Sequence, residues 1–231
     1  MMLQVAAVDP IRELSLAIYA ILIAVELRFG INFVRAYKKD RELSVIGSIG
    51  MFFLLMAVGR CAFIVFDYYL TEMTPAAYGP NVYMYQIATA LQGAGEGFFL
   101  FVAEKQIFAG RDKYLILIGY VITMALGLVY PDFLTAQSIT TIGGLFILFI
   151  PPAYIYMLIK SSGPIRKLTA IVLLGMVVFA VGVIMLGEAV MIPLASLVGT
   201  RYAVHALSAV FKLVGATIVY LGFRPQIPRG G

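Results

Sequence analysis

Residues 82–103 read VYMYQIATALQGAGEGFFLFVA, an apolar segment in which Glu96 is the one charged residue. A transmembrane helix needs about 20 predominantly apolar residues, and this segment is long enough to cross a bilayer. A charged side chain at the bilayer centre costs at least about 2.5–3.5 kcal/mol on insertion scales. We therefore expect Glu96 to face the interior of a helical bundle, where it can meet a residue of opposite charge.

The composition of the whole chain is also typical of a membrane protein. Of its 231 residues, 62% are hydrophobic and 13% are charged, whereas soluble domains contain about 45–50% apolar and about 25% charged residues. The net charge is +5. The basic residues lie in short connections between apolar segments, which indicates membrane topology and argues against nucleic-acid binding. The first residues, MMLQVAAVDPIRELS, have no basic region before an apolar core, so we expect them to belong to the mature chain.

Seven segments have the length and polarity expected of membrane-spanning helices. They predict an all-α integral membrane protein, a seven-transmembrane helix bundle that forms a single domain over residues 1–231. Pro151 and Pro152 lack backbone donors and predict a kink in the fifth span. The approximate bounds of the spans are 13–35, 45–67, 83–105, 114–130, 138–159, 169–192 and 202–223.

The distribution of lysine and arginine predicts the orientation of the bundle. Twelve of these residues fall on the side that holds the first, third and fifth connections and the C-terminal tail, while Arg12 and Arg201 fall on the other side. Because cytoplasmic loops are enriched in lysine and arginine, we expect the N-terminus outside and the C-terminus inside the cell membrane. The twelve are Arg35, Lys38, Lys39, Arg41, Lys105, Arg111, Lys113, Lys160, Arg166, Lys167, Arg224 and Arg229.

Several charged residues lie inside the predicted spans and are expected to pair with one another. At about 1.5 Å per residue, Glu26, Glu96 and Lys212 lie at similar depths, and Arg60 lies about 6 Å outward of the middle of its span. These four residues predict an intramembrane charge network, with Lys212 as the first candidate partner of Glu96 and Arg60 as the second. Farther outward, Glu188 and His205 predict a second polar group. The alternative is that these ion pairs only fix helix register.

Helical periodicity supports the inward placement of these charges. His205, Ser208 and Lys212 recur at i, i+3 and i+7, so they share one face of the last span. Arg60 and Asp67 are seven residues apart and could share a face of the second span. The polar stripes predict a polar interior or a water-filled cleft. Near Glu96, two glycines with small-xxx-small spacing, Gly93 and Gly97, would let another helix approach closely.

No motif in the chain predicts a catalytic or metal site. The single cysteine (Cys61) and single histidine (His205) exclude a disulfide framework, a multi-cysteine metal site and bis-histidine haem ligation within the chain. No Ser-His-Asp or HExxH pattern is evident. The glycines of GAGEG lie inside a helix, where they serve packing and not phosphate binding. We expect no enzymatic activity and no cofactor.

Two functional hypotheses follow from the topology and the charges. The first is a receptor- or sensor-like bundle that signals to a cytoplasmic protein through the basic inner connections, with the charge network as its bistable element. The second is a proton-coupled transporter or channel, in which a buried carboxylate exchanges a proton. Either protein would have the lipid bilayer as its main partner, and either could form a homo-oligomer.

A third hypothesis comes from a resemblance to microbial rhodopsins in length, number of spans and orientation. Lys212, in HALSAVFKLVGATIVYLGF, is similar in position to the lysine that carries retinal in the seventh helix of that family. The resemblance implies retinal attached to Lys212 and Glu96 as its counter-ion. The chain departs from the family in having no tryptophan, in having Ser208 where the family usually has aspartate, and in lacking the family's arginine and aromatic pattern around QGAGEGFF.

Overall fold

The computed structural model describes residues 9–107 and 114–226, and this part of the chain consists of helices joined by short connections, without strands. The basic residues Arg111, Lys113 and Arg229, which entered the orientation prediction, lie outside the described residues. The elements are α1 (Pro10–Lys39), α2 (Ser44–Ile64), the π-helical turn η1 (Val65–Leu70), η2 (Pro75–Ala77), α3 (Val82–Ile107), α4 (Leu115–Val129), α5 (Phe133–Leu145), η3 (Phe146–Phe149), α6 (Ile150–Lys160), α7 (Gly163–Ile184), α8 (Glu188–Val198), α9 (Arg201–Phe223) and η4 (Arg224–Gln226).

Five helical segments of the described chain are long and apolar enough to cross a membrane: Pro10–Lys39, Ser44–Leu70, Phe133–Lys160, Gly163–Ile184 and Arg201–Phe223. The chain is therefore a membrane-like helical protein by composition and helix length. The predicted third and fourth spans are also helical, as α3 and α4, but they are not among these five. With 15 residues, α4 is about 22 Å long, which is shorter than the hydrocarbon core of a typical bilayer.

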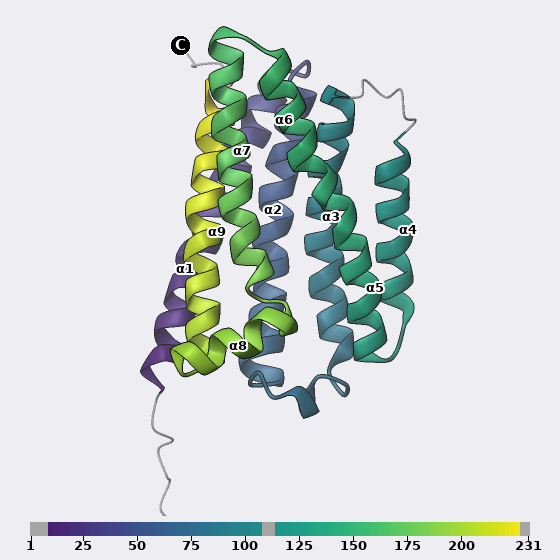
Figure 1. Cartoon of the computed structure of the whole chain (residues 1–231), viewed down its shortest axis with the longest axis vertical. Coiled ribbons are helices and arrows are strands. Elements are labelled where there is room, and N and C mark those ends of the chain that lie inside the picture. Colours follow the sequence, from purple (N-terminus) through teal and green to yellow (C-terminus); the bar gives the residue numbers. More distant parts are fainter. Residues whose placement is uncertain (1–8, 108–113, 227–231) are drawn as a thin grey trace, which may run out of the picture.

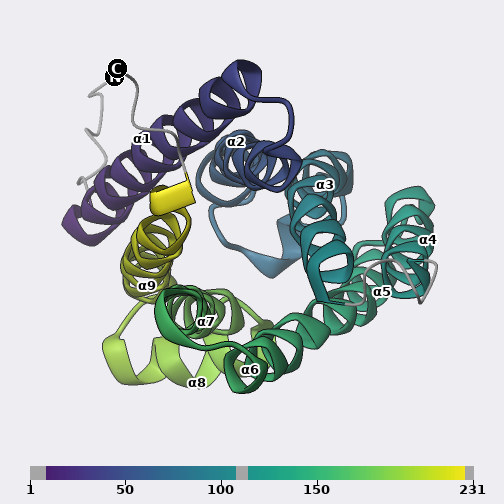
Figure 2. The ribbon, with the colours of Figure 1, turned by 90° about the horizontal axis from the view of Figure 1, so that it is seen from above.

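The long helices stand side by side and form a ring when viewed along their axes (Figures 1 and 2). Around the ring α1 packs against α2, α2 against α3, α6 against α7, α7 against α9, and α9 closes the ring against α1. The gap between α3 and α7 is bridged by the continuous rod of α5 and α6, and α4 packs outside the ring against α3 and α5. Helix α8 lies across one end of the bundle, which we call the α8 end (Figure 1).

The fifth predicted span is not one regular α-helix. The α-helical hydrogen bonding is interrupted by the 3₁₀ turn η3, directly before Pro151 and Pro152. These prolines have no N–H groups to donate to the carbonyls four residues earlier, in η3. The turn η3 therefore separates α5, which packs against α4, from α6, which packs against α7.

The predicted sixth span, residues 169–192, was wrong in its boundaries. Helix α7 begins earlier, at Gly163, and ends at Ile184, while residues from Glu188 onward form the separate helix α8. Between the two helices, Gly187 is the N-cap of α8 and has an extended conformation (φ −66°, ψ 132°), so α7 and α8 do not run on as one helix. Apolar composition runs on through this break, so the hydropathy of the segment does not reveal it.

One buried hydroxyl in the core leads to a prediction about stability. The Tyr154 side chain is 2% exposed and packs in the main apolar cluster, and its hydroxyl oxygen has no hydrogen-bond partner among residues 9–107 and 114–226. An unsatisfied buried polar group costs about 1–3 kcal/mol. Tyr154→Phe is therefore expected to raise the free energy of unfolding by up to about 1 kcal/mol, measured by denaturant titration in mixed micelles.

Tyr120→Phe is the matched control for this prediction. Tyr120 is equally buried, but its hydroxyl lies 2.9 Å from the Gly93 carbonyl oxygen and 3.0 Å from a Glu96 carboxyl oxygen. Its loss should lower the free energy of unfolding by about 1–2 kcal/mol. Equal losses in both variants would contradict the assignment of Tyr154 as the unsatisfied group.

Candidate functional site

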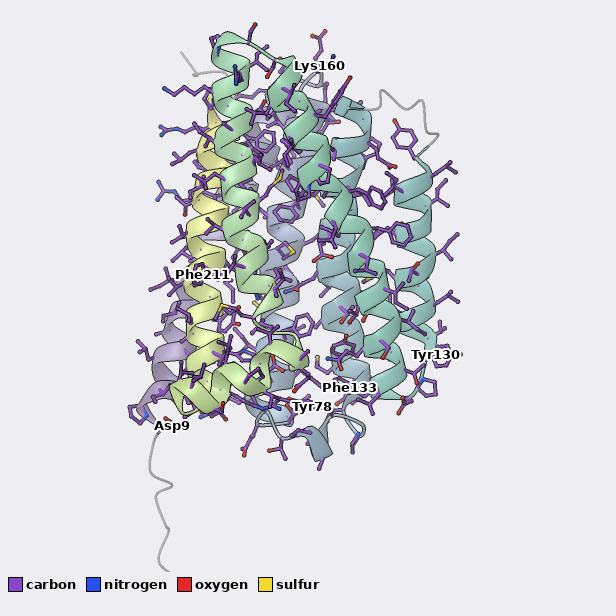
Figure 3. All side chains as sticks on the ribbon, in the orientation of Figure 1. Asp9, Tyr78, Tyr130, Phe133, Lys160 and Phe211 are labelled. Atoms are coloured by element: carbon purple, nitrogen blue, oxygen red, sulfur yellow. The ribbon has the colours of Figure 1, made fainter. Side chains whose placement is uncertain are left out.

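A cavity of about 260 Å³ opens inside the ring toward the α8 end of the bundle. It extends from Tyr78 and Phe133, which lie at that end in Figure 3, to Met56, Glu96 and Lys212 in the middle of the long helices. We call it the charged cavity. Its charged or titratable lining residues, apart from tyrosines, are Arg60, Asp67, Glu96, Glu188, His205 and Lys212, and its neutral polar ones include Gln92, Gln137 and Thr141.

Arg60 forms a buried ion pair with Glu26 on the neighbouring helix α1. Its Nε lies 2.9 Å from Glu26 Oε2 and its Nη2 lies 3.0 Å from Oε1, so the guanidinium and carboxylate meet as two parallel forks. The two side chains are 3% and 0% exposed. Arg60 also packs its guanidinium over the Phe179 ring, 5.6 Å from the ring centre. This pair satisfies both charges and holds α1 to α2 beside the cavity.

Glu96 lines the cavity without forming an ion pair. Its carboxyl oxygen is within hydrogen-bond distance of the Tyr120 hydroxyl from α4. The glycines around it let neighbouring helices approach, as predicted: a Cβ at Gly93 would lie 2.6 Å from Met124 Cε of α4, and one at Gly95 would lie 3.1 Å from the Phe52 carbonyl oxygen of α2. The helix that the Gly93–Gly97 spacing admits is therefore α4.

Lys212 is the buried charge without a direct partner. The side chain is 4% exposed and lines the cavity, and within the described chain no hydrogen bond and no carboxylate within 4.0 Å is found for its Nζ. Its stem packs against α7, since a Cβ at Gly182 would lie 2.9 Å from Lys212 Cγ. The charges of Arg60, Glu26, Asp67 and Glu96 act on it through space. The ammonium group is thus held in place by its stem while its head faces the cavity.

Asp67 adds a carboxylate that also lacks a direct partner. It belongs to the π-helical turn η1, which continues α2, and it lines the cavity. For its side chain, the described residues supply no hydrogen bond and no ion pair, and the charge that acts on it most strongly is that of Lys212. π-Helical turns are rare and occur often at functional sites. Here the wider turn brings Asp67 to the same cavity as Lys212.

A second ion pair lies near the cavity mouth. Arg201, at the start of α9, donates to both carboxylate oxygens of Glu188 on α8, each at 2.9 Å, and its Nη1 lies 3.1 Å from the Tyr78 hydroxyl. Burial raises the pKa of Tyr78 to about 12, and the Arg201 charge acts in the opposite direction. The phenol therefore stays protonated at neutral pH. These three residues connect α8, α9 and the loop before α3.

His205 is separate from this pair. Its Nδ1 lies 3.4 Å from the Tyr19 hydroxyl of α1, and its ring packs edge-on against Tyr68, which is hydrogen-bonded to Ser15. His205 and Glu188 line the same cavity but make no direct bond to each other in the described chain. The predicted outer polar group is therefore two groups, one around Arg201 and one around Tyr19.

The contact between α8 and α9 gives a second prediction. Arg201→Lys removes the planar fork that bonds both oxygens of Glu188. Because the two side chains are 22% and 35% exposed, we expect a loss of no more than about 1 kcal/mol in global stability. The rate of amide hydrogen exchange in α8 should rise by about fivefold, because a loss of about 1 kcal/mol in the local opening free energy corresponds to that factor. Arg166→Lys is the control, because Arg166 is exposed at the start of α7, away from α8. Unchanged exchange in α8 would show that the fork does not hold this helix.

Of the four residues predicted as a charge network, Arg60, Glu96 and Lys212 line one cavity and Glu26 bonds Arg60, but the pairs differ from those expected. The expected Glu96–Lys212 ion pair is not formed, and Arg60 pairs with Glu26 and not with Glu96. Sequence reasoning missed Tyr120, which bonds Glu96 from α4, and it gave Asp67 no role beyond a shared face with Arg60. The seven-residue spacing of Arg60 and Asp67 was the available signal, although the π-helical turn changes the angle at which Asp67 projects.

The described residues hold no group of three or more histidine, cysteine or acidic side chains that could bind a metal ion. Comparison of the sequence with protein-family models and with curated proteins, and of the structure with solved structures, finds no match. The charged cavity with its unpartnered lysine is therefore the feature from which function has to be argued.

Proposed function

We propose that this chain is a sensor- or receptor-like membrane protein with seven spans, an outward N-terminus and an inward C-terminus, which binds a small ligand in the charged cavity. The observation that carries this proposal is Lys212, a buried amine that lines the cavity and has no bonded partner in the part of the chain that the structure describes. A buried charge is costly unless it is paired. A ligand group that pairs with Lys212 would recover this cost on binding.

The arrangement of the basic residues supports the proposed orientation. Lys39, Arg41, Lys105, Lys160 and Arg224 lie at the ends of helices opposite α8. Under the positive-inside rule this end faces the cytoplasm, and the charged cavity then opens outward. Occupancy of the cavity could be relayed along α9 and α2 to the inner connections, where a cytoplasmic protein would bind. A homo-oligomer is compatible with the same relay.

The experiment combines accessibility with transport. Purified protein in proteoliposomes is treated from outside with formaldehyde and cyanoborohydride, which methylate accessible amines, and Lys212 is assayed by mass spectrometry. We expect Lys212 to be methylated in spite of its burial, because it lines an open cavity. An internal pH dye should report no proton flux above that of empty liposomes. Flux that Glu96→Gln abolishes would overturn the sensor proposal in favour of a proton-coupled transporter, and an unreactive Lys212 would overturn the proposed cavity.

A second candidate function is retinal binding, favoured by the same unpartnered amine. The Lys212 amine could condense with an aldehyde to an imine, with loss of water, and the carboxylates of Glu96 and Asp67 would stabilise the positive charge of the protonated imine. All-trans retinal is added to the purified protein and a visible spectrum is recorded. A red-shifted band that is lost in Lys212→Ala and retained in Lys160→Ala would support this candidate. Absence of the band would remove it.

A further inference from the structure

The charged cavity contains one unpartnered group of each sign. Lys212 and Asp67 both line it, and among the described residues neither has an ion pair or a side-chain hydrogen bond. The other charged lining residues have bonded partners: Arg60 donates to Glu26, Arg201 donates to Glu188, and Glu96, which has no ion pair in the described chain, is hydrogen-bonded to Tyr120. Lys212 and Asp67 therefore determine which charged groups a ligand needs in order to bind in this cavity.

A ligand with a single charge would leave one of these groups unsatisfied. An anion would pair with Lys212 and leave the Asp67 carboxylate without a partner, and a cation would do the reverse. Since stranded charges in a partly desolvated site are costly, each class of singly charged ligand would lose part of its binding energy. A molecule that carries an anionic and a cationic group can satisfy both.

The surroundings of the two groups indicate which end of the ligand goes where. Phe66, Tyr78, Tyr85 and Phe133 form an aromatic cluster toward the α8 end, and all four line the cavity with Asp67. Aromatic faces and a carboxylate together favour an ammonium group. Lys212 lies near the middle of α9, at the deep end of the cavity, which Met56 and Glu96 also line. The ligand anion therefore belongs at the bottom of the cavity and the ammonium near its mouth.

From these contacts we infer that the charged cavity binds a small zwitterion, an amino acid or a compound of the same charge pattern, with its carboxylate on Lys212 and its ammonium group between Asp67 and the aromatic cluster. This inference rests on the proposed function and specifies its ligand class. The cavity volume of about 260 Å³ fits a molecule of this size. Gln92 and Gln137, which also line the cavity, supply neutral hydrogen-bonding groups to the remainder of the ligand.

The experiment uses matched probes on the full chain in nanodiscs. A series of ω-amino acids from glycine to 6-aminohexanoate is compared with n-alkylamines and n-alkanoates of the same chain lengths, by calorimetric titration and by protection of Lys212 against reductive methylation. We expect at least one amino acid to bind and to protect Lys212, and its matched amine and carboxylate to bind at least about thirtyfold more weakly. Lys212→Met and Asp67→Asn should each weaken binding of the amino acid by a similar factor, while Lys160→Met should leave its binding unchanged.

Each other result has a defined meaning. If a singly charged probe binds as tightly as the matched amino acid and protects Lys212, the ligand-binding cavity stands and the zwitterion inference is wrong. The inference is equally wrong if an amino acid binds but leaves Lys212 reactive, or if Lys212 is methylated by the small reagent and no amino acid protects it. If Lys212 does not react even without ligand, the cavity itself is closed and the proposed function fails with it. The protection assay uses the wild-type chain, so it remains decisive if a variant does not fold.

Discussion

Arg60→Met is expected to lower the free energy of unfolding by about 3–5 kcal/mol, because it leaves the Glu26 carboxylate buried without its partner. Glu26 is 0% exposed, and both of its oxygens are bonded by the Arg60 guanidinium. The loss includes the contact of Arg60 with the Phe179 ring, which is worth about 0.5–2 kcal/mol. The measurement is an SDS titration of the folded protein in mixed micelles, followed by far-UV circular dichroism.

The double variant Glu26→Met, Arg60→Met distinguishes two causes of the lost stability: the unpaired charge of Glu26 and the lost contacts of Arg60. It removes both charges and fills their space with flexible apolar side chains, so we expect it to recover at least half of the stability that Arg60→Met loses. Arg28→Met is the control on the same helix as Glu26. Arg28 is exposed, and the change should alter stability by less than about 0.5 kcal/mol. A double variant as unstable as the sum of its single changes would show that Glu26 and Arg60 do not stabilise each other.

The Glu26–Arg60 pair also shows where sequence reasoning was limited. Apolar length and charge placement predict helices at the right positions and an inward-facing set of charged residues. They do not fix the rotation of each helix about its axis. This rotation decides which of several charged residues at the same depth form a pair. Here α1 and α2 meet through Gly30 and Gly50, where a Cβ on Gly30 would lie 3.0 Å from the Gly50 carbonyl oxygen. This close approach brings Glu26 within reach of Arg60.

Two other differences have local causes that apolar composition does not record. The break between α7 and α8 contains the extended Gly187, in a segment whose one charged residue is Glu188. The position of Asp67 is set by the π-helical turn η1, which departs from the 3.6-residue period that the sequence argument assumes. The charge network could therefore be predicted as a set of residues, but its pairs and the unpartnered state of Lys212 required the structure.

The second large effect on stability is expected where α7 packs against α9, the helix that carries Lys212. A Cβ on Gly215 would lie 2.5 Å from the backbone nitrogen of Phe179 and 2.7 Å from its Cα. Because these are backbone atoms, they cannot move aside as a flexible side chain would, and the two helices must separate. The opposing glycine of α7, Gly175, is equally close to backbone: its Cβ would lie 2.7 Å from the nitrogen of Val219. The contact is thus built from glycine on both helices.

Gly215→Ala is therefore expected to lower the free energy of unfolding by about 2–3 kcal/mol, in spite of the higher helix propensity of alanine. Gly144→Ala is the matched control, since a Cβ on this helical glycine would meet nothing within 4 Å. It should be neutral or stabilise the protein by up to about 1 kcal/mol. Lys212 lies one turn before Gly215 on α9, so separation of the helices should also change the rate at which Lys212 is methylated. Equal stability of the two variants, with an unchanged Lys212 rate, would show that α9 is not held by this contact and that Lys212 is positioned by other residues.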